Sequence, residues 1–69
     1  MKLDPAKRLG DNVRRIRLKK GMSQGDICRK LGVDRSYISN IEAGKKNLTL
    51  ATIERIAAAL GVPSSDLLK

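Results

Sequence analysis

The chain has 69 residues, enough for one small domain that buries roughly 60 % of its unfolded surface. One cysteine and no histidine exclude an internal disulfide and the usual His- and Cys-ligated zinc site. A net charge of +8 favours a polyanionic partner such as nucleic acid, with a basic helix on a membrane surface as the weaker alternative.

No apolar run in the sequence is long enough to indicate a membrane span or a signal peptide. The apolar run AAAL of 57–60 is far too short to span a membrane, and the segment MKLDPAKRLGDN has no apolar core typical of a signal peptide. We therefore expect a soluble cytoplasmic protein without a membrane partner, with one domain over residues 1–69. The basic charge is uneven, because residues 1–35 carry eleven basic and four acidic residues, a net +7, and residues 36–69 a net +1.

Apolar residues recur at helical spacing throughout the chain, and no alternating strand pattern is present. Glycines close several of these segments, as Gly21, Gly32 and Gly61 do. The pattern predicts an all-α fold of five helices, over about residues 5–20, 23–31, 34–43, 49–60 and 63–68.

Three helix starts carry the same local signal. Ser23, Asp34 and Thr49 are good N-cap residues, whose side chains can accept hydrogen bonds from the free amides of the first turn. Each follows an apolar residue that can pack on another five positions later, the spacing of a hydrophobic staple. These pairs are Met22 with Ile27, Val33 with Ile38 and Leu48 with Ile53.

The second and third helices are joined by Gly32 and Val33 alone. So short a connection turns the two helices sharply, as in a helix-turn-helix, and Gly32 can adopt the left-handed conformation that ends a helix abruptly. Cys28 is small where the third helix must cross the second. The sequence therefore predicts a helix-turn-helix of residues 23–31 and 34–43.

Residues 22–62, MSQGDICRKLGVDRSYISNIEAGKKNLTLATIERIAAALGV, resemble the Xre family of helix-turn-helix proteins, which includes phage Cro and cI-type repressors. The resemblance implies a lambda-repressor-like fold, and Cys28 stands where the family usually has alanine. RxxKGMSQ and DRSYISNIEAGKKNLT are most similar to the small controller proteins of restriction–modification systems. The short segments that match the family are Ser23-Gln24, Leu31-Gly32-Val33, Ile41-Glu42, Gly44-Lys45 and Ala59-Leu60-Gly61-Val62.

The third helix is the expected recognition helix. Arg35 and Ser36 lie at its start, where side chains enter the major groove, and arginine can pair with guanine O6 and N7. Ser39 and Asn40 follow on the same outward side. The resemblance likewise implies base contacts at Arg35, Ser36 and Asn40, and the alternative is an ordinary solvated face.

Other polar residues are candidates for the DNA backbone. The resemblance implies phosphate contacts by Gln24 and by the loop residues Lys45, Lys46 and Asn47, and it leaves open a base contact by Lys46. The alternative for each lysine is a solvated charge. Tyr37 has two open roles, packing at the edge of the core or contacting the DNA backbone.

The resemblance also pairs Arg17 with Glu42 in a structural salt bridge. No catalytic constellation is present, because Ser36 and Ser39 have no histidine to activate them and the carboxylates are scattered. We therefore expect a protein that is not an enzyme and binds neither a cofactor nor a metal.

A single recognition helix contacts few base pairs, so we expect a homodimer that binds two half-sites of a palindromic operator in double-stranded DNA. The resemblance places the dimer contact in the C-terminal region, where Val62, Leu67 and Leu68 are the candidates. RNA polymerase is left open as a further partner. Two alternatives remain, a DNA-binding antitoxin, although no extra segment for toxin capture is evident, and a non-enzymatic adaptor that binds protein or RNA.

Overall fold

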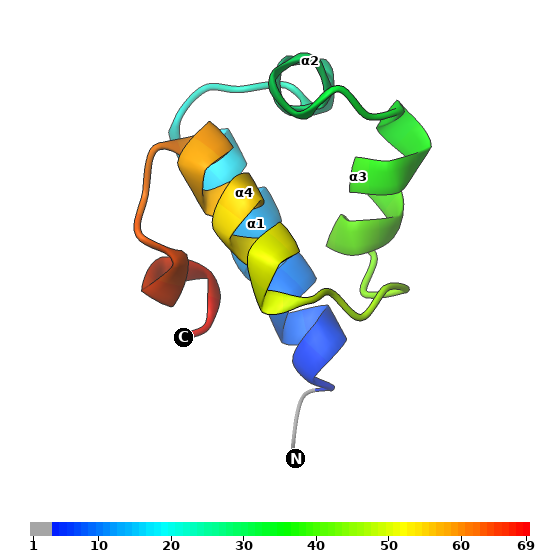
Figure 1. Cartoon of the computed structure of the whole chain (residues 1–69), viewed down its shortest axis with the longest axis vertical. Helices are drawn as coiled ribbons and strands as arrows, with labels where there is room; N and C mark the ends of the chain where they lie inside the picture. Colours follow the sequence, from blue (N-terminus) through cyan, green and yellow to red (C-terminus); the bar gives the residue numbers. More distant parts are fainter. Residues whose placement is uncertain (1–3) are drawn as a thin grey trace.

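The computed structural model describes residues 4–69, which form four α-helices and one turn of 3-10 helix (Figure 1). Over these residues the chain contains no strand, so the all-α prediction is confirmed, and no helix in this range is long and apolar enough to cross a membrane. The elements are α1 (Pro5–Lys19), α2 (Gln24–Leu31), α3 (Arg35–Glu42), α4 (Leu50–Leu60) and the 3-10 turn η1 (Ser64–Leu67).

The prediction of a fifth α-helix is wrong, because η1 is a single 3-10 turn of four residues. The amides of Asp66 and Leu68 donate to carbonyl oxygens three residues earlier, those of Pro63 and Ser65, over 3.0 and 3.1 Å. A segment of this length closes too few hydrogen bonds to offset the cost of starting an α-helix, and 3-10 geometry is common in such short pieces.

Two of the three predicted N-caps form the expected hydrogen bonds. Ser23 Oγ accepts from the Asp26 amide over 3.0 Å, and the Asp26 carboxylate accepts from the Ser23 amide over 2.8 Å, a complete capping box. Thr49 caps α4 through the amide of Thr52. Asp34 has the extended backbone of an N-cap, but its side chain makes no capping bond, and the Tyr37 amide donates to the Asp34 carbonyl oxygen over 3.0 Å. The prediction of a side-chain cap at Asp34 is therefore wrong, and this carboxylate stays exposed.

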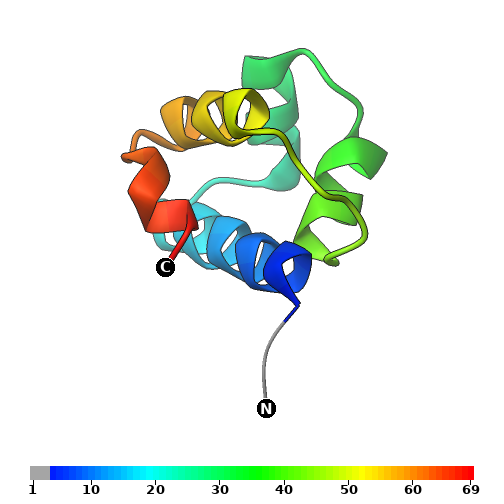
Figure 2. The ribbon, with the colours of Figure 1, turned by 60° about the horizontal axis from the view of Figure 1, so that its bottom comes forward.

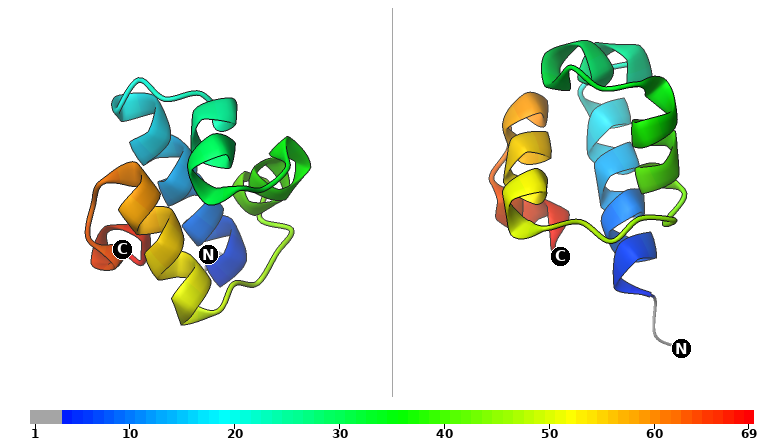
Figure 3. Two further views of the ribbon diagram at one scale, coloured as in Figure 1. Left: turned by 45° about the horizontal axis from the view of Figure 1, so that its top comes forward. Right: turned by 45° about the vertical axis from the view of Figure 1, so that its right-hand side comes forward.

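The helices enclose one core. α2 lies across one end of α1 and α4, while α3 packs along α1, so α1 has α4 on one side and α3 on the other (Figure 3). η1 contacts both α4 and α1 and closes the side of the molecule away from α3 (Figure 2). The predicted staple residues Met22, Val33 and Leu48 are partly buried against this core. Its fully buried side chains are Val13, Ile27, Ile38, Ile41, Ile56 and Leu67.

Gly10 sets how closely α1 and α3 approach. A Cβ atom at this position would lie 2.2 Å from the carbonyl oxygen of Ile41 and 2.9 Å from that of Glu42. No side chain fits such a gap, so the backbones of the two helices are in direct contact. Glycine inside a helix costs stability relative to alanine, and here that cost allows the end of α3 to pack against α1.

Asn12 holds the last residues of the chain against α1. It is buried, and its Nδ2 donates to the carbonyl oxygens of Leu67 and Lys69 over 2.9 and 3.1 Å. These bonds satisfy a buried amide and place Leu67 in the core, where it is fully buried.

Candidate nucleic-acid interface

The turn between α2 and α3 ends α2 abruptly. Gly32 has φ +70°, and the amides of both Gly32 and Val33 donate to the carbonyl oxygen of Cys28, over 2.8 and 3.1 Å. A left-handed residue at the helix end satisfies the last carbonyl groups and lets the chain change direction at once. α3 therefore begins at Arg35, three residues after Gly32, and packs across α2, as in a helix-turn-helix (Figure 1).

α3 has one buried side and one polar outward side. The side chains of Ile38 and Ile41 are 0 % and 1 % exposed, and they anchor the helix to the core. Arg35, Ser36 and Ser39 are exposed on the outward side, and Asn40 is half-buried. All four residues expected to contact bases therefore lie on the accessible surface of one helix, which we call the reading surface.

A shallow hollow on this surface, which we call the α3 hollow, is lined by several of the predicted residues. Ser36, Tyr37 and Asn40 from α3 line it together with Lys46 from the loop that follows α3. Its other lining residues come from the turn between the helices, Gly32, Val33 and Asp34. The hollow has polar and apolar walls, so it can hold both hydrogen-bonding edges and a methyl group or ring face of a ligand.

The loop after α3 splits the three residues that were grouped in the sequence. Lys45 is exposed, Lys46 is half-buried at the α3 hollow, and Asn47 lines a different hollow beside Pro5 and Leu68. Contact of these residues with the DNA backbone stays a prediction. Only Lys46 lines the same hollow as the α3 residues.

Tyr37 packs at the edge of the core, one of the two roles that the sequence left open, and its contact with the DNA backbone stays a prediction. Its side chain is half-buried and packs against the core. Lys46 Nζ lies 4.9 Å from the centroid of its ring, within the range of a cation–π interaction. Tyr37 therefore packs at the edge of the core and also lines the α3 hollow.

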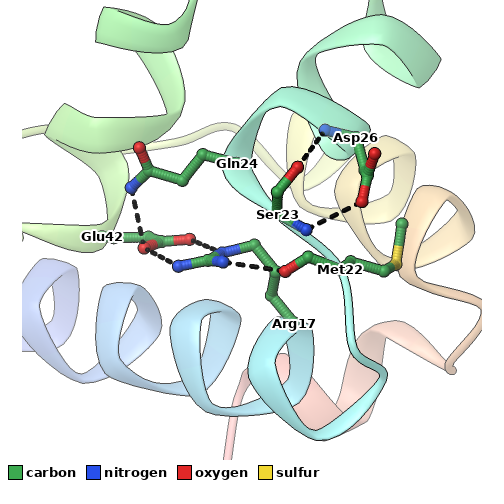
Figure 4. Close-up of polar contacts among 6 residues, drawn as sticks. All are labelled: Arg17, Met22, Ser23, Gln24, Asp26 and Glu42. Carbon is green, nitrogen blue, oxygen red and sulfur yellow. Dashed lines mark hydrogen bonds and ion pairs between the residues drawn. The ribbon is translucent and has the colours of Figure 1, made fainter.

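A buried network ties the start of α2 to the end of α3 (Figure 4). Arg17 donates from Nε to Glu42 Oε2 over 2.7 Å and from Nη2 to Oε1 over 3.0 Å, so the predicted ion pair is present and bidentate. Arg17 Nη1 also donates to the Met22 carbonyl oxygen over 2.9 Å, and Gln24 Nε2 donates to Glu42 Oε1 over 3.1 Å. We call these four residues the Arg17 network.

The Arg17 network is part of the scaffold. The side chains of Arg17 and Glu42 are 8 % and 5 % exposed, and the hydrogen bond to Glu42 raises the pKa of the Arg17 guanidinium. Removing one partner of such a pair leaves an uncompensated buried charge and costs about 3–5 kcal/mol. Gln24, expected at a phosphate, has its amide nitrogen bound to Glu42, so the network also orients the first turn of α2.

The structure changes the expected dimer contact. Leu67 is fully buried in the core of its own chain, because the Asn12 hydrogen bonds hold η1 against α1, so its assignment to the dimer interface is wrong. Leu68 is 49 % exposed and Val62 is half-buried. These two stay candidates for contact with a second copy.

Two important residues were missed in the sequence, Gly10 and Asn12. Both carried a signal. Gly10 is a glycine in the interior of a strongly periodic helix, and Asn12 stands directly beside Val13, three residues after Leu9 on the buried stripe of α1. A polar residue or a glycine at such a position indicates a specific tertiary contact.

A sharp turn between two packed helices, a polar outward face on the second helix and cations beside it define a DNA-binding domain of the helix-turn-helix class. Residues 13–67 match the protein family described as Helix-turn-helix. The chain belongs to this family, in its Xre-like branch, and resembles controller proteins of restriction–modification systems.

Three relatives illustrate this similarity. The chain is 45 % identical over 60 residues to a hypothetical transcription factor of Neisseria meningitidis, and the match covers 87 % of this chain and 57 % of that protein. It is 48 % identical over 60 residues to control protein C.BamHI of Bacillus amyloliquefaciens, covering 86 % and 74 % of the two chains. The restriction–modification controller protein C.Esp1396I, solved as a tetramer on its natural 35 base-pair operator, superposes with a TM-score of 0.81 at 33 % identity, covering 99 % and 100 %. None of the three is named as an enzyme.

Proposed function

We propose that the chain is a transcription regulator that binds a palindromic operator as a homodimer and serves as the controller of a restriction–modification system. The observation that carries the proposal is the reading surface of α3. Arg35, Ser36, Ser39 and Asn40 face outward together on a helix that is anchored by buried isoleucines. Arginine, serine and asparagine side chains are suited to base edges in the major groove.

The charge distribution supports binding to the DNA backbone. Within residues 4–69, Arg35, Lys45 and Lys46 are in no ion pair, so their charges are available to a polyanion. Each phosphate that such a cation neutralises releases a counterion and steepens the dependence of log affinity on log salt by about 0.9. Lys45, Lys46, Gln24 and Asn47 are the proposed backbone contacts, and the Tyr37 ring lies beside Lys46.

Dimerisation is proposed from the demands of specificity and from one exposed apolar site. Two half-sites about 34 Å apart give one small domain enough base pairs for a selective operator. Leu68 is 49 % exposed beside the end of η1, and Val62 is half-buried just before η1. A second copy that covers Leu68 and Val62 would remove both side chains from water.

Selection of bound sequences from a random DNA pool tests the proposal. We expect an enriched motif with two inverted half-sites about one helical turn apart, and sedimentation of the selected complex at the mass of two chains per site. An enriched sequence without inverted symmetry would contradict the dimer, and a pool without any enriched motif would contradict sequence-specific binding itself. Transcription with purified RNA polymerase on the selected operator then shows whether a polymerase contact belongs to the function.

A further inference from the structure

Lys46 is held in place in a way that its neighbour Lys45 is not. Its Nζ lies 4.9 Å from the centroid of the Tyr37 ring, and its side chain is half-buried, whereas Lys45 is exposed. In the described part of the chain neither lysine takes part in an ion pair. The aromatic ring is therefore the feature that distinguishes two adjacent residues of the same charge.

The Tyr37 ring is itself fixed by the fold. It packs against the core, and it lines a small cavity together with residues of α2, the turn and α4. These residues are Leu31, Val33, Thr52, Arg55 and Ile56. A ring that packs against the core has a defined position, so a cation beside it loses part of the freedom that a loop lysine normally has.

Lys46 lies next to the reading surface of α3. It lines the α3 hollow with Ser36 and Asn40, the two proposed base contacts next to Tyr37. A lysine ammonium has three hydrogen-bond donors, and its attraction to a ring face is electrostatic, so donors remain for a second, anionic group. Ordering such a side chain before binding removes part of the entropy cost of the contact.

We propose that Tyr37 is a positioning residue, which uses its ring to hold the Lys46 ammonium over the α3 hollow for one DNA phosphate beside the bases that α3 contacts. Lys45 adds charge without a fixed place. The proposal rests on the proposed function, because it assigns roles within the same operator complex. It predicts that the contribution of Lys46 to binding depends on the Tyr37 ring and that the contribution of Lys45 does not.

Operator titrations with single and double variants test the dependence. Lys46→Met is expected to lower affinity and to reduce the log–log salt slope by about 0.9 for each protomer of the bound dimer. Tyr37→Leu is expected to lower affinity about two- to five-fold, the range of an exposed cation–π contact. The double variant Tyr37→Leu/Lys46→Met is expected to bind nearly as well as Lys46→Met alone. The matched control, Tyr37→Leu with Lys45→Met, is expected to show the product of the two single losses.

Tyr37→Phe keeps the ring and is expected to bind like the wild type. An equal loss in Tyr37→Phe and Tyr37→Leu would assign the effect to the hydroxyl group and overturn the proposal. Independent losses for Tyr37→Leu and Lys46→Met would overturn it as well. If the wild type has no preferred sequence, the proposed function and this inference fail together, whereas wild-type binding with independent losses rejects the inference alone.

Proton NMR of the free protein gives a measurement that needs neither DNA nor a folded leucine variant. A lysine above an aromatic ring has its Cε protons shifted upfield by the ring current. We expect this shift for Lys46 in the wild type and in Tyr37→Phe, and no such shift for Lys45. Lys46 protons at the position of the Lys45 protons in the wild type would overturn the proposal.

Discussion

The two ends of α3 hold charged side chains in opposite situations. At its C-terminal end, Glu42 is buried and accepts hydrogen bonds from Arg17 and Gln24. At its N-terminal end, Asp34 and Arg35 are exposed, and neither is in an ion pair within residues 4–69. The eight-residue helix α3 therefore has a buried, hydrogen-bonded carboxylate, Glu42, at one end and an exposed cation, Arg35, at the other.

The difference separates charged side chains that stabilise the fold from charged side chains that remain available to a ligand. A buried charge must be paired, because the loss of hydration is costly, so Arg17 is committed to Glu42. An exposed charge gains little from a partner on the same surface and is left for an anion from outside. Fixing one end of α3 rigidly is what gives the other end a defined position, so the two situations depend on each other.

The largest expected effect comes from breaking the buried end. Glu42→Ala leaves Arg17 buried without a counter-charge and is expected to lower the free energy of unfolding by about 3–5 kcal/mol, which is most of the stability of a small domain. Urea denaturation measures the loss. Glu54→Ala removes an exposed carboxylate of α4 and is expected to change stability by less than about 0.5 kcal/mol. Equal effects of the two substitutions would show that the Arg17 network does not hold α3.

The second effect concerns the backbone contact at the same end. Gly10→Ala places a methyl group 2.2 Å from the Ile41 carbonyl oxygen, so α3 must move away from α1. We expect a loss of about 3 kcal/mol, at the upper end of the cost of overpacking, measured by thermal unfolding. Gly25→Ala in α2 meets atoms only at 3.5 Å and beyond, and it is expected to be neutral or slightly stabilising. A stable Gly10→Ala variant would contradict the close approach.

The third effect concerns the free end. Arg35→Ala is expected to cost about 1–3 kcal/mol of operator affinity and to relax the base preference at one position in each half-site. Competition titrations with single-base operator variants measure both. Arg14→Ala, an exposed arginine of α1, is expected to weaken binding to every sequence alike. A uniform loss for Arg35→Ala would mean that Arg35 contacts phosphate and not a base.

The smallest effect concerns the start of α2, next to the Arg17 network. The Ser23 amide, together with Arg29 nearby, lowers the pKa of the Asp26 carboxyl below its ordinary value. A carboxyl with a lowered pKa stabilises the fold above its unfolded value of about 3.9, and this contribution is lost as the pH falls through the folded value. The unfolding free energy of the wild type is therefore expected to fall between about pH 5 and 3 more steeply than that of Asp26→Asn.

Urea unfolding at pH 5, 4 and 3 measures this difference. Asp11→Asn removes an exposed carboxylate without a capping role and is expected to follow the wild-type curve. Parallel curves for the wild type and Asp26→Asn would contradict a capping contribution from this carboxylate.

Local signals in the sequence predicted most of the elements, because each depends on residues close together in the chain. The caps at Ser23 and Thr49 and the left-handed Gly32 need only neighbouring amides and carbonyl groups. The same holds for the outward face of α3, which follows from helical spacing. At Ser23 the Asp26 amide donates to both the carbonyl and the hydroxyl oxygen, whereas at Asp34 the Tyr37 amide donates to the carbonyl oxygen alone. Composition does not decide whether the side chain turns toward the amide.

The remaining features depend on residues far apart in the chain. The sequence by itself determined an all-α chain, the abrupt turn after α2 and the residues that face outward on α3, since these follow from local hydrogen bonding and periodicity. Only the tertiary structure decided that Leu67 belongs to the core, that Gly10 meets the backbone of α3, that Gln24 is bound by Glu42 and that Lys46 lies over Tyr37. Burial, close approach and pairing are set by how separate helices pack, and no spacing along the chain encodes those distances.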